Sequence, residues 1–125
     1  MDRISMIVNN LIMEQINGGE TAPVKLVEYA NGQLGVRLDY MKLKNQYFDN
    51  EYDSEVTELY GDALRKTMHK FKKEIQYVVI KSNLDERAVV LMIDNEELAI
   101  PIKDYFMEQI CPELSWIRVY VEPVD

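Results

Sequence analysis

Few side chains in this sequence have the type and spacing that covalent catalysis needs. Nucleophilic catalysis requires a nucleophile, a base and an orienting group within hydrogen-bond reach, and the chain has one histidine and one cysteine. The histidine, His69, lies among the cations of residues 65–73, which favour its neutral form. The cysteine, Cys111, follows Ile110 and has no adjacent cation that would activate a thiolate. We therefore predict a surface or boundary histidine, a small buried cysteine, and no catalytic residue, cofactor or enzymatic activity.

Acidic residues are more numerous, and they fall in predicted turns, where water keeps carboxylates ionised. The spacing of Asp49, Glu51 and Asp53 resembles the start of a calcium-binding loop. Ser54 stands where such a loop needs glycine, and Tyr60 stands where it needs the closing bidentate glutamate. The sequence also lacks a phosphate-binding glycine loop and the Gly-x-Ser-x-Gly and His-Glu-x-x-His motifs. It therefore predicts no metal site.

A segment rich in tyrosine and acid precedes the longest predicted helix, and it is our candidate surface for binding another protein. Aromatic side chains are enriched at protein interfaces, and clustered carboxylates can select and steer a basic partner. The alternative is that the same rings pack over the edge of the sheet, and the sequence does not distinguish the two. The candidate partner-binding residues are Tyr47, Phe48, Asp49, Glu51, Tyr52 and Asp53.

A basic segment at residues 65–73 is our candidate for binding a small anionic ligand, such as a phosphorylated or nucleotide-like molecule. Positions 66, 69, 70 and 73 share one face of a helix, and two outward arginines on alternating strands would add to the site if the sheet brought them close. The alternative is a solvated helix end whose cations interact with the helix dipole. The candidate ligand-binding residues are Arg37, Lys66, His69, Lys70, Lys73 and Arg118.

The composition indicates one globular domain spanning residues 1–125. Hydrophobic residues make up 47% and charged residues 29%, which is ordinary for a folded protein and argues against disorder. The net charge of −8 makes general binding to nucleic acid unfavourable, because such binding depends on cations that neutralise phosphates. No apolar run reaches the length of a membrane span, and the N-terminus lacks the basic start of a signal peptide. We expect a cytoplasmic protein of bacterial or phage type.

The first third of the sequence predicts a helix followed by a β-hairpin. Residues 3–16 carry apolar side chains at helical spacing, and the apolar stripe is wide enough to cover the sheet or to be shared with a second subunit. Residues 23–40 show the alternation of two half-buried strands. Between them Asn31 and Gly32 predict a type I′ turn, in which both residues take positive φ angles. Residues 41–52 fit either a strand extension or a loop.

The rest of the chain predicts a long helix, a β-meander and a last strand. The helix at 54–73 has Asp53 or Ser54 as its N-cap. In the meander two runs are apolar at consecutive positions, which indicates strands buried on both faces. The predicted elements are the helix 54–73, the meander 75–101 with apolar runs at 77–80 and 88–93, a short helix 102–110 and the strand 116–122.

These elements define an α+β fold with a largely antiparallel sheet. The charge, the aromatic segment and the missing catalytic set favour a small acidic, non-enzymatic binding protein. We picture an inhibitor, antagonist or immunity-type protein that occludes a partner protein. The alternatives are a protein that sequesters a small anionic ligand through its basic residues, and an assembly subunit of a phage or of a larger complex. A homodimer is compatible with all three.

Overall fold

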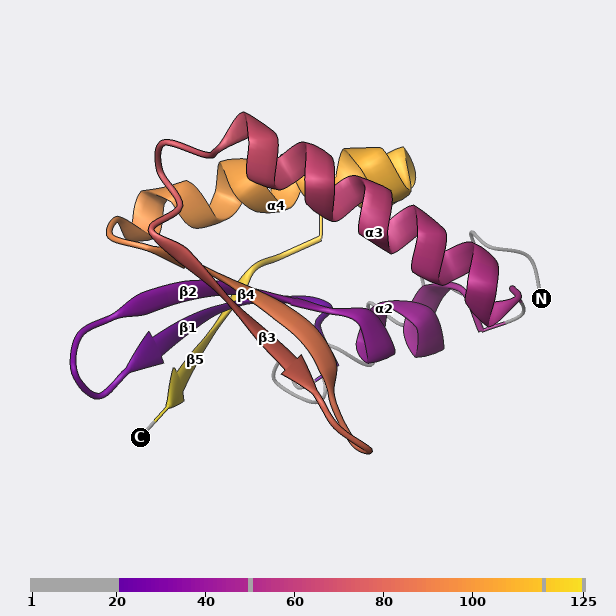
Figure 1. Ribbon diagram of the computed structural model, residues 1–125, viewed down its shortest axis with the longest axis horizontal. Coiled ribbons are helices and arrows are strands. Elements are labelled where there is room, and N and C mark those ends of the chain that lie inside the picture. Colours follow the sequence, from indigo (N-terminus) through magenta and orange to yellow (C-terminus); the bar gives the residue numbers. More distant parts are fainter. Residues whose placement is uncertain (1–20, 50, 116, 125) are drawn as a thin grey trace.

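The computed structural model describes residues 21–49, 51–115 and 117–124. Its centre is a five-stranded sheet in the order β3-β4-β2-β1-β5. The chain order is β1 (Val24–Tyr29), β2 (Leu34–Asp39), α2 (Tyr40–Tyr47), α3 (Asp53–Lys70), β3 (Tyr77–Ser82), β4 (Arg87–Ile93), α4 (Ala99–Ile110) and β5 (Tyr120–Val124). The predicted α+β class with a mostly antiparallel sheet is confirmed (Figure 1). The helix predicted at residues 3–16 lies outside the described residues.

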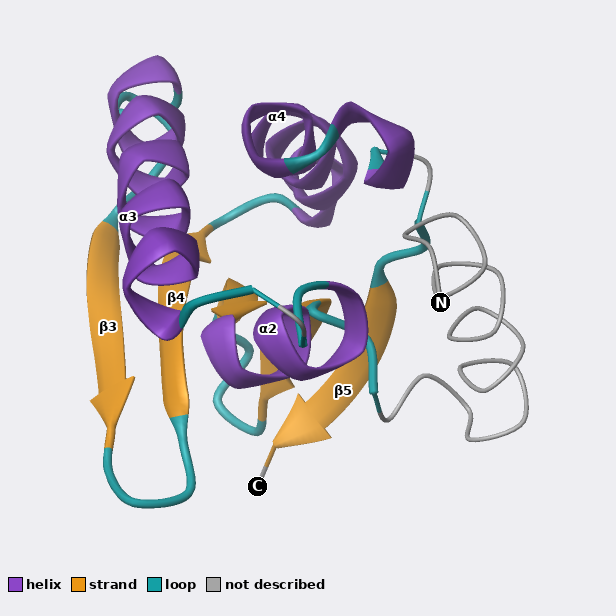
Figure 2. Ribbon diagram, turned by 90° about the vertical axis from the view of Figure 1, so that its right-hand side faces the viewer, coloured by secondary structure: helices purple, strands orange, loops and turns teal. Residues whose placement is uncertain are grey.

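Helices α3 and α4 lie side by side over one face of the sheet (Figures 1 and 2). The apolar residues of α3 recur at helical spacing, and Val56, Tyr60 and Ala63 are buried against the sheet and α4. The ring of Tyr60 meets the ring of Phe106 on α4 edge to face, with centroids 5.8 Å apart. The strands contribute alternate residues to this core, which places Arg37 and its neighbours of the same parity on the opposite face of the sheet.

The β1–β2 hairpin is confirmed, but its predicted turn type is wrong. Gly32 has a φ of +88°, but none of the described non-glycine residues has a positive φ. Asn31 therefore does not take the conformation that a type I′ turn requires. Instead Gly32 N–H donates to Tyr29 O, and Tyr29 N–H donates to Gln33 O. This is a turn followed by a left-handed glycine, a common three-residue hairpin connection. The Asn31 side chain accepts a hydrogen bond from Gln33 N–H and holds the turn.

Residues 41–52 were ambiguous in the sequence, and residues 41–47 of this range belong to helix α2. Asp39 ends β2 and caps α2, because its side chain accepts a hydrogen bond from Lys42 N–H at 2.9 Å. The helix then runs to Tyr47 and buries Tyr40 and Leu43. The strand therefore turns into a helix without a loop between them, and the predicted loop shrinks to residues 48–52.

The predicted meander at 75–101 is only partly correct. Residues 87–93 form β4, which pairs with β2 and β3, and its apolar run is buried as predicted. Strand β3 is an edge strand, and Tyr77 and Ile80 are exposed, so the prediction that 77–80 is buried on both faces is wrong. The last part of the predicted meander, residues 96–101, is not a strand. Residues 96–98 make a 3₁₀ turn, and α4 begins at Ala99 with Pro101 in its first turn, where a missing N–H breaks no helical bond.

The remaining boundaries also move. Helix α3 spans 53–70 in place of 54–73, and its N-cap is Tyr52, which makes no side-chain capping bond. Strand β5 spans 120–124 in place of 116–122, with Pro123 inside it. It pairs in parallel with β1, at the edge of the sheet opposite β3. An edge strand tolerates proline because one of its sides has no strand to pair with.

Candidate functional site

The candidate partner-binding residues gather where α2 ends and α3 begins, but they divide into a buried and an exposed set. Tyr47 and Phe48 are 1% and 3% exposed and belong to the hydrophobic core, so neither ring is accessible to a partner. Tyr52 is 77% exposed. The carboxylates at 49, 51 and 53 are exposed as well. We call residues 48–49 and 51–59 the α2–α3 corner.

The α2–α3 corner contains a shallow hollow of about 140 Å³. It is lined by the apolar residues Phe48, Val56 and Leu59 and by the carboxylates Glu51 and Glu55. Pockets that hold drug-sized ligands have volumes of roughly 300–1,000 Å³. The hollow therefore has the size to receive one side chain of another molecule, and the two carboxylates favour a basic one.

Several hydrogen bonds fix the shape of this corner. Lys44 Nζ donates to the carbonyl oxygens of Phe48 and Glu51, at 3.3 and 3.1 Å. The hydroxyl of Tyr40 donates to Asp53 Oδ1 at 2.6 Å, and the hydroxyl of Thr57 donates to Tyr40 Oη at 2.9 Å. These hydrogen bonds hold the backbone between α2 and α3, from which the exposed side chains of the corner project.

Asp53 has a structural task that separates it from the other carboxylates of the corner. Burial and the hydrogen bond to Asp53 raise the pKa of Tyr40, so this hydroxyl stays a proton donor to the carboxylate. Arg87 Nη1 lies 3.9 Å from the same carboxylate and stacks over the Tyr40 ring, 4.1 Å from its centroid. Asp53 also begins α3, where negative charge suits the helix dipole. These structural contacts are enough to account for an acidic residue at position 53.

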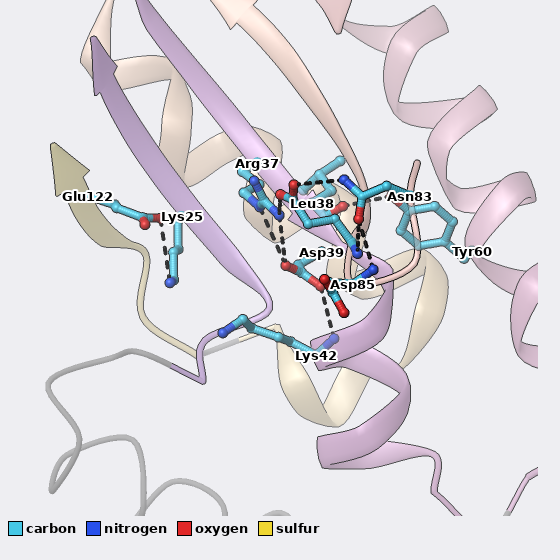
Figure 3. Close-up of polar contacts among 10 residues, drawn as sticks. Lys25, Arg37, Leu38, Asp39, Lys42, Tyr60, Asn83, Asp85 and Glu122 are labelled. Atoms are coloured by element: carbon cyan, nitrogen blue, oxygen red, sulfur yellow. Dashed lines mark hydrogen bonds and ion pairs between the residues drawn. The ribbon is translucent and has the colours of Figure 1, made fainter. Parts of the chain in front are cut away.

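The candidate ligand-binding cations do not form one site. Arg37 lies on the sheet face opposite α3 and donates to Asp39 Oδ2 at 3.4 Å (Figure 3). It also donates to Glu86 Oε2 at 2.7 Å. The hydrogen bond from Arg37 lowers the pKa of Glu86, which keeps this carboxylate charged. Arg37 is thus neutralised by two carboxylates of its own chain. Lys25 on the same face pairs with Glu122 at 3.5 Å.

The other cations are exposed at the end of α3 or before β5. Lys66, His69 and Lys73 are exposed, while Lys70 Nζ lies 5.1 Å from the centroid of the Tyr105 ring. Arg118 is exposed and precedes β5. The structure therefore brings together only the cations that already share the helix end, and it separates Arg37 from them by the thickness of the sheet.

Cys111 is 2% exposed, as expected for a small buried residue, and its thiol donates to Glu113 Oε2 at 2.6 Å. Within the described ranges no three side chains among histidine, cysteine, aspartate and glutamate come close enough together to hold a metal ion. The helices in those ranges are all too short or too polar to cross a bilayer.

The hollow of the corner was missed in the sequence. Glu55 and Leu59 lie one helical turn apart on α3, and Leu59 is half-buried beside the core. Their position beside Phe48 depends on α2, which packs residues 40–47 against α3. The continuation of helical apolar spacing through Tyr40, Leu43 and Tyr47 was the available signal.

Comparison with protein-family models, with curated proteins and with solved structures finds no match to this chain. Any functional assignment therefore rests on the geometry and charge of the chain itself.

Proposed function

We propose that the protein is a small acidic binding module that occludes a basic surface of another protein through the α2–α3 corner. One observation carries the proposal. The exposed Tyr52 directly follows Glu51, which lines a hollow together with Glu55 and three apolar residues. An exposed ring beside an apolar, acid-flanked hollow can hold an anchoring contact, whereas an acidic turn alone is adequately explained by solvation.

The chemistry of the corner suits a lysine or arginine side chain of the partner. The aliphatic part of such a side chain would lie against Leu59, the least buried apolar residue of the hollow, and its charged end would meet Glu51 or Glu55. Tyrosine is frequent among the residues that dominate binding energy, and Tyr52 would contribute apolar area and a hydroxyl. Asp49 and the net charge of −8 would mainly speed the encounter with a basic partner.

The alternative of an anionic ligand has less support. Arg37 is engaged by two carboxylates, and the remaining candidate cations form an exposed helix end. Cations at the C-terminal end of a helix interact favourably with the helix dipole, so their presence there needs no ligand.

The proposal is tested by affinity capture from the source cells with three forms of the full chain. The first is wild type. The second is the corner variant Asp49→Lys/Glu51→Lys/Tyr52→Ala. The third is the control variant Glu96→Lys/Glu97→Lys, which reverses the same number of exposed charges at the 3₁₀ turn before α4.

We expect one partner protein to be enriched by wild type and by the control variant, and lost with the corner variant. Its purified form should bind wild type with an affinity that falls as salt rises, because the contact pairs opposite charges. We expect Asp49→Lys alone to leave the fold unchanged, which circular dichroism checks. Equal enrichment of the partner by all three forms would refute the assignment of the binding surface. Recovery of no partner protein by wild type would refute the function.

A further inference from the structure

The sheet has two edges, and they differ in how well they resist pairing with another strand. The β5 edge contains Pro123, which has no N–H to donate, and proline is one of the common means of blocking an edge. The β3 edge contains no proline. Its side chains include Tyr77 at 46% and Ile80 at 73% exposure. Figure 2 shows β3 as the outermost element on its side of the molecule, with α3 above it and not beyond it.

The ladder between β3 and β4 identifies the backbone groups that face outward. Asn83 N–H donates to Glu86 O at 2.9 Å, which marks this pair as hydrogen-bonded. Hydrogen-bonded and non-hydrogen-bonded pairs alternate along an antiparallel ladder. By the register of β3 on β4, the N–H and C=O groups of Val78, Ile80 and Ser82 therefore point away from β4. These groups form a row on the open side of the strand.

We propose that β3 pairs antiparallel with β3 of a second copy of this chain, which joins the two sheets into one. The axis of two-fold symmetry passes between Val79 and Val79 of the second copy. In this register Val78 faces Ile80 of the second copy in a hydrogen-bonded pair, and the reverse pair repeats it. This surface is separate from the α2–α3 corner, so the inference does not depend on the proposed function.

In this register the side chains of β3 are complementary to those of β3 in the second copy. On the sheet face opposite α3, the two copies of Val79 meet, and Lys81 faces Tyr77 of the second copy, which allows a cation–π contact. On the other face the exposed Ile80 meets Val78. Isologous interfaces require such self-complementarity. Lys81 is the only charged residue of the strand, so no like charges oppose each other there.

Charges beyond the strand ends are complementary as well. The register directs the β3–β4 turn, which carries the exposed Asp85, toward the segment that precedes β3 in the second copy. That segment carries the exposed Lys72, Lys73 and Glu74 and has a net positive charge. This complementarity favours a second copy over an unrelated extended peptide.

The contact is small, which sets its expected strength. Complexes that bury less than about 1,200 Å² are usually weak or transient, and one pair of strand edges lies in that range. We therefore expect a dimer whose dissociation constant lies above about 1 μM.

Sedimentation equilibrium of the full chain is the first test. The apparent mass of wild type should rise from 14.7 kDa toward twice that value as the concentration rises from about 10 μM to 1 mM. Ile80→Lys should keep the chain monomeric over the same range, because it places a charge on the edge. The matched control Val121→Lys alters a 57% exposed position on the β5 edge and should dimerise like wild type. Circular dichroism and the thermal midpoint establish that each variant is folded.

Disulfide cross-linking tests the register. The native cysteine is buried, so Val79→Cys adds the only readily accessible thiol among the described residues. Opposite residues of a non-hydrogen-bonded pair have Cα atoms about 4.5 Å apart, within the range that a disulfide spans. Under mild oxidation Val79→Cys should form a covalent dimer at least about tenfold faster than Ile80→Cys, because residue 80 faces residue 78 in this register.

Each outcome decides the proposal. A wild-type chain that stays monomeric at 1 mM overturns it, and so does a dimer that Ile80→Lys leaves intact. Equal weakening by Ile80→Lys and Val121→Lys would show that charge in general, and not this edge, controls association. Faster cross-linking of Ile80→Cys than of Val79→Cys would overturn the register.

Discussion

Gly35 on β2 is the position where a single added methyl group should have the largest readable effect. It pairs with Met92 on β4 and with Val27 on β1, in the middle of the sheet. A Cβ atom there would overlap Val90 Cγ1 and would lie 3.0 Å from Met92 Sδ. Both neighbours are almost fully buried, Val90 at 1% and Met92 at 2% exposure. The absence of a side chain at residue 35 is thus what makes room for these two.

Two opposing effects set the magnitude of Gly35→Ala. Overpacking a core costs about 1–3 kcal/mol. Replacing glycine reduces the entropy of the unfolded chain and returns about 0.4–1 kcal/mol. We expect a net loss of about 1–2 kcal/mol in the free energy of unfolding, measured by urea denaturation with an unchanged m-value.

A double-mutant cycle separates this reasoning from a general loss of stability. Val90→Ala alone should cost about 2 kcal/mol through the cavity it leaves. In Gly35→Ala/Val90→Ala the new methyl group occupies space that the valine vacated, so the double variant should be more stable than the sum of the single changes by about 1 kcal/mol. The matched control is Gly32→Ala, where a Cβ meets nothing within 4 Å but the φ of +88° is strained. Its effect should add to that of Val90→Ala within about 0.5 kcal/mol. Additivity at Gly35 would refute the packing argument.

Three further predictions follow from described contacts. The hydrogen bond from Arg37 lowers the pKa of Glu86 from its usual 4.5. The stabilisation from this ion pair is therefore complete above pH 4.5 and is lost as the pH falls through the native pKa. Urea midpoints measured between pH 5 and about pH 3 should fall less in Glu86→Gln than in wild type. Tyr60→Phe removes the hydroxyl that donates to Leu38 O at 2.6 Å and should lower the free energy of unfolding by about 1–2 kcal/mol; an unchanged urea midpoint would contradict this. Val90→Asp places an unpaired charge in a dry part of the sheet and should leave the chain unfolded at 25 °C, with NMR amide shifts collapsed to the random-coil range, whereas a dispersed spectrum would contradict the burial assigned to this position.

The sequence predicted the parts of the fold that depend on local pattern. The alternation through residues 34–38 located β2, and the run at 88–93 located the strand that is buried on both faces. The same argument failed for β3, because an apolar run at 77–80 looks alike whether its strand lies in the middle of a sheet or at its edge. Edge position depends on strand order, which a local pattern does not contain.

Non-local pairing also explains the other differences. The parallel contact of β5 with β1 joins opposite ends of the described chain, and no short-range signal indicates it. Of the candidate partner-binding residues, 49, 51 and 52 are exposed at the α2–α3 corner, as a binding surface requires. Whether the rings of Tyr47 and Phe48 face solvent or pack inward was left open, because the pattern did not reveal the helix α2 that precedes the corner.

The pairing of β1 with β5 has a consequence for the order in which the chain can fold. Strand β1 pairs with β2 through a short hairpin, and this contact can form as soon as both strands are synthesised. Its other side stays open until residues 120–124 have left the ribosome, since Lys25 pairs with Tyr120 and Val27 with Glu122. The edge of β1 that faces β5 therefore lacks its partner strand through most of the chain's synthesis. That interval, and not the finished protein, is when β1 is most exposed to pairing with the wrong strand.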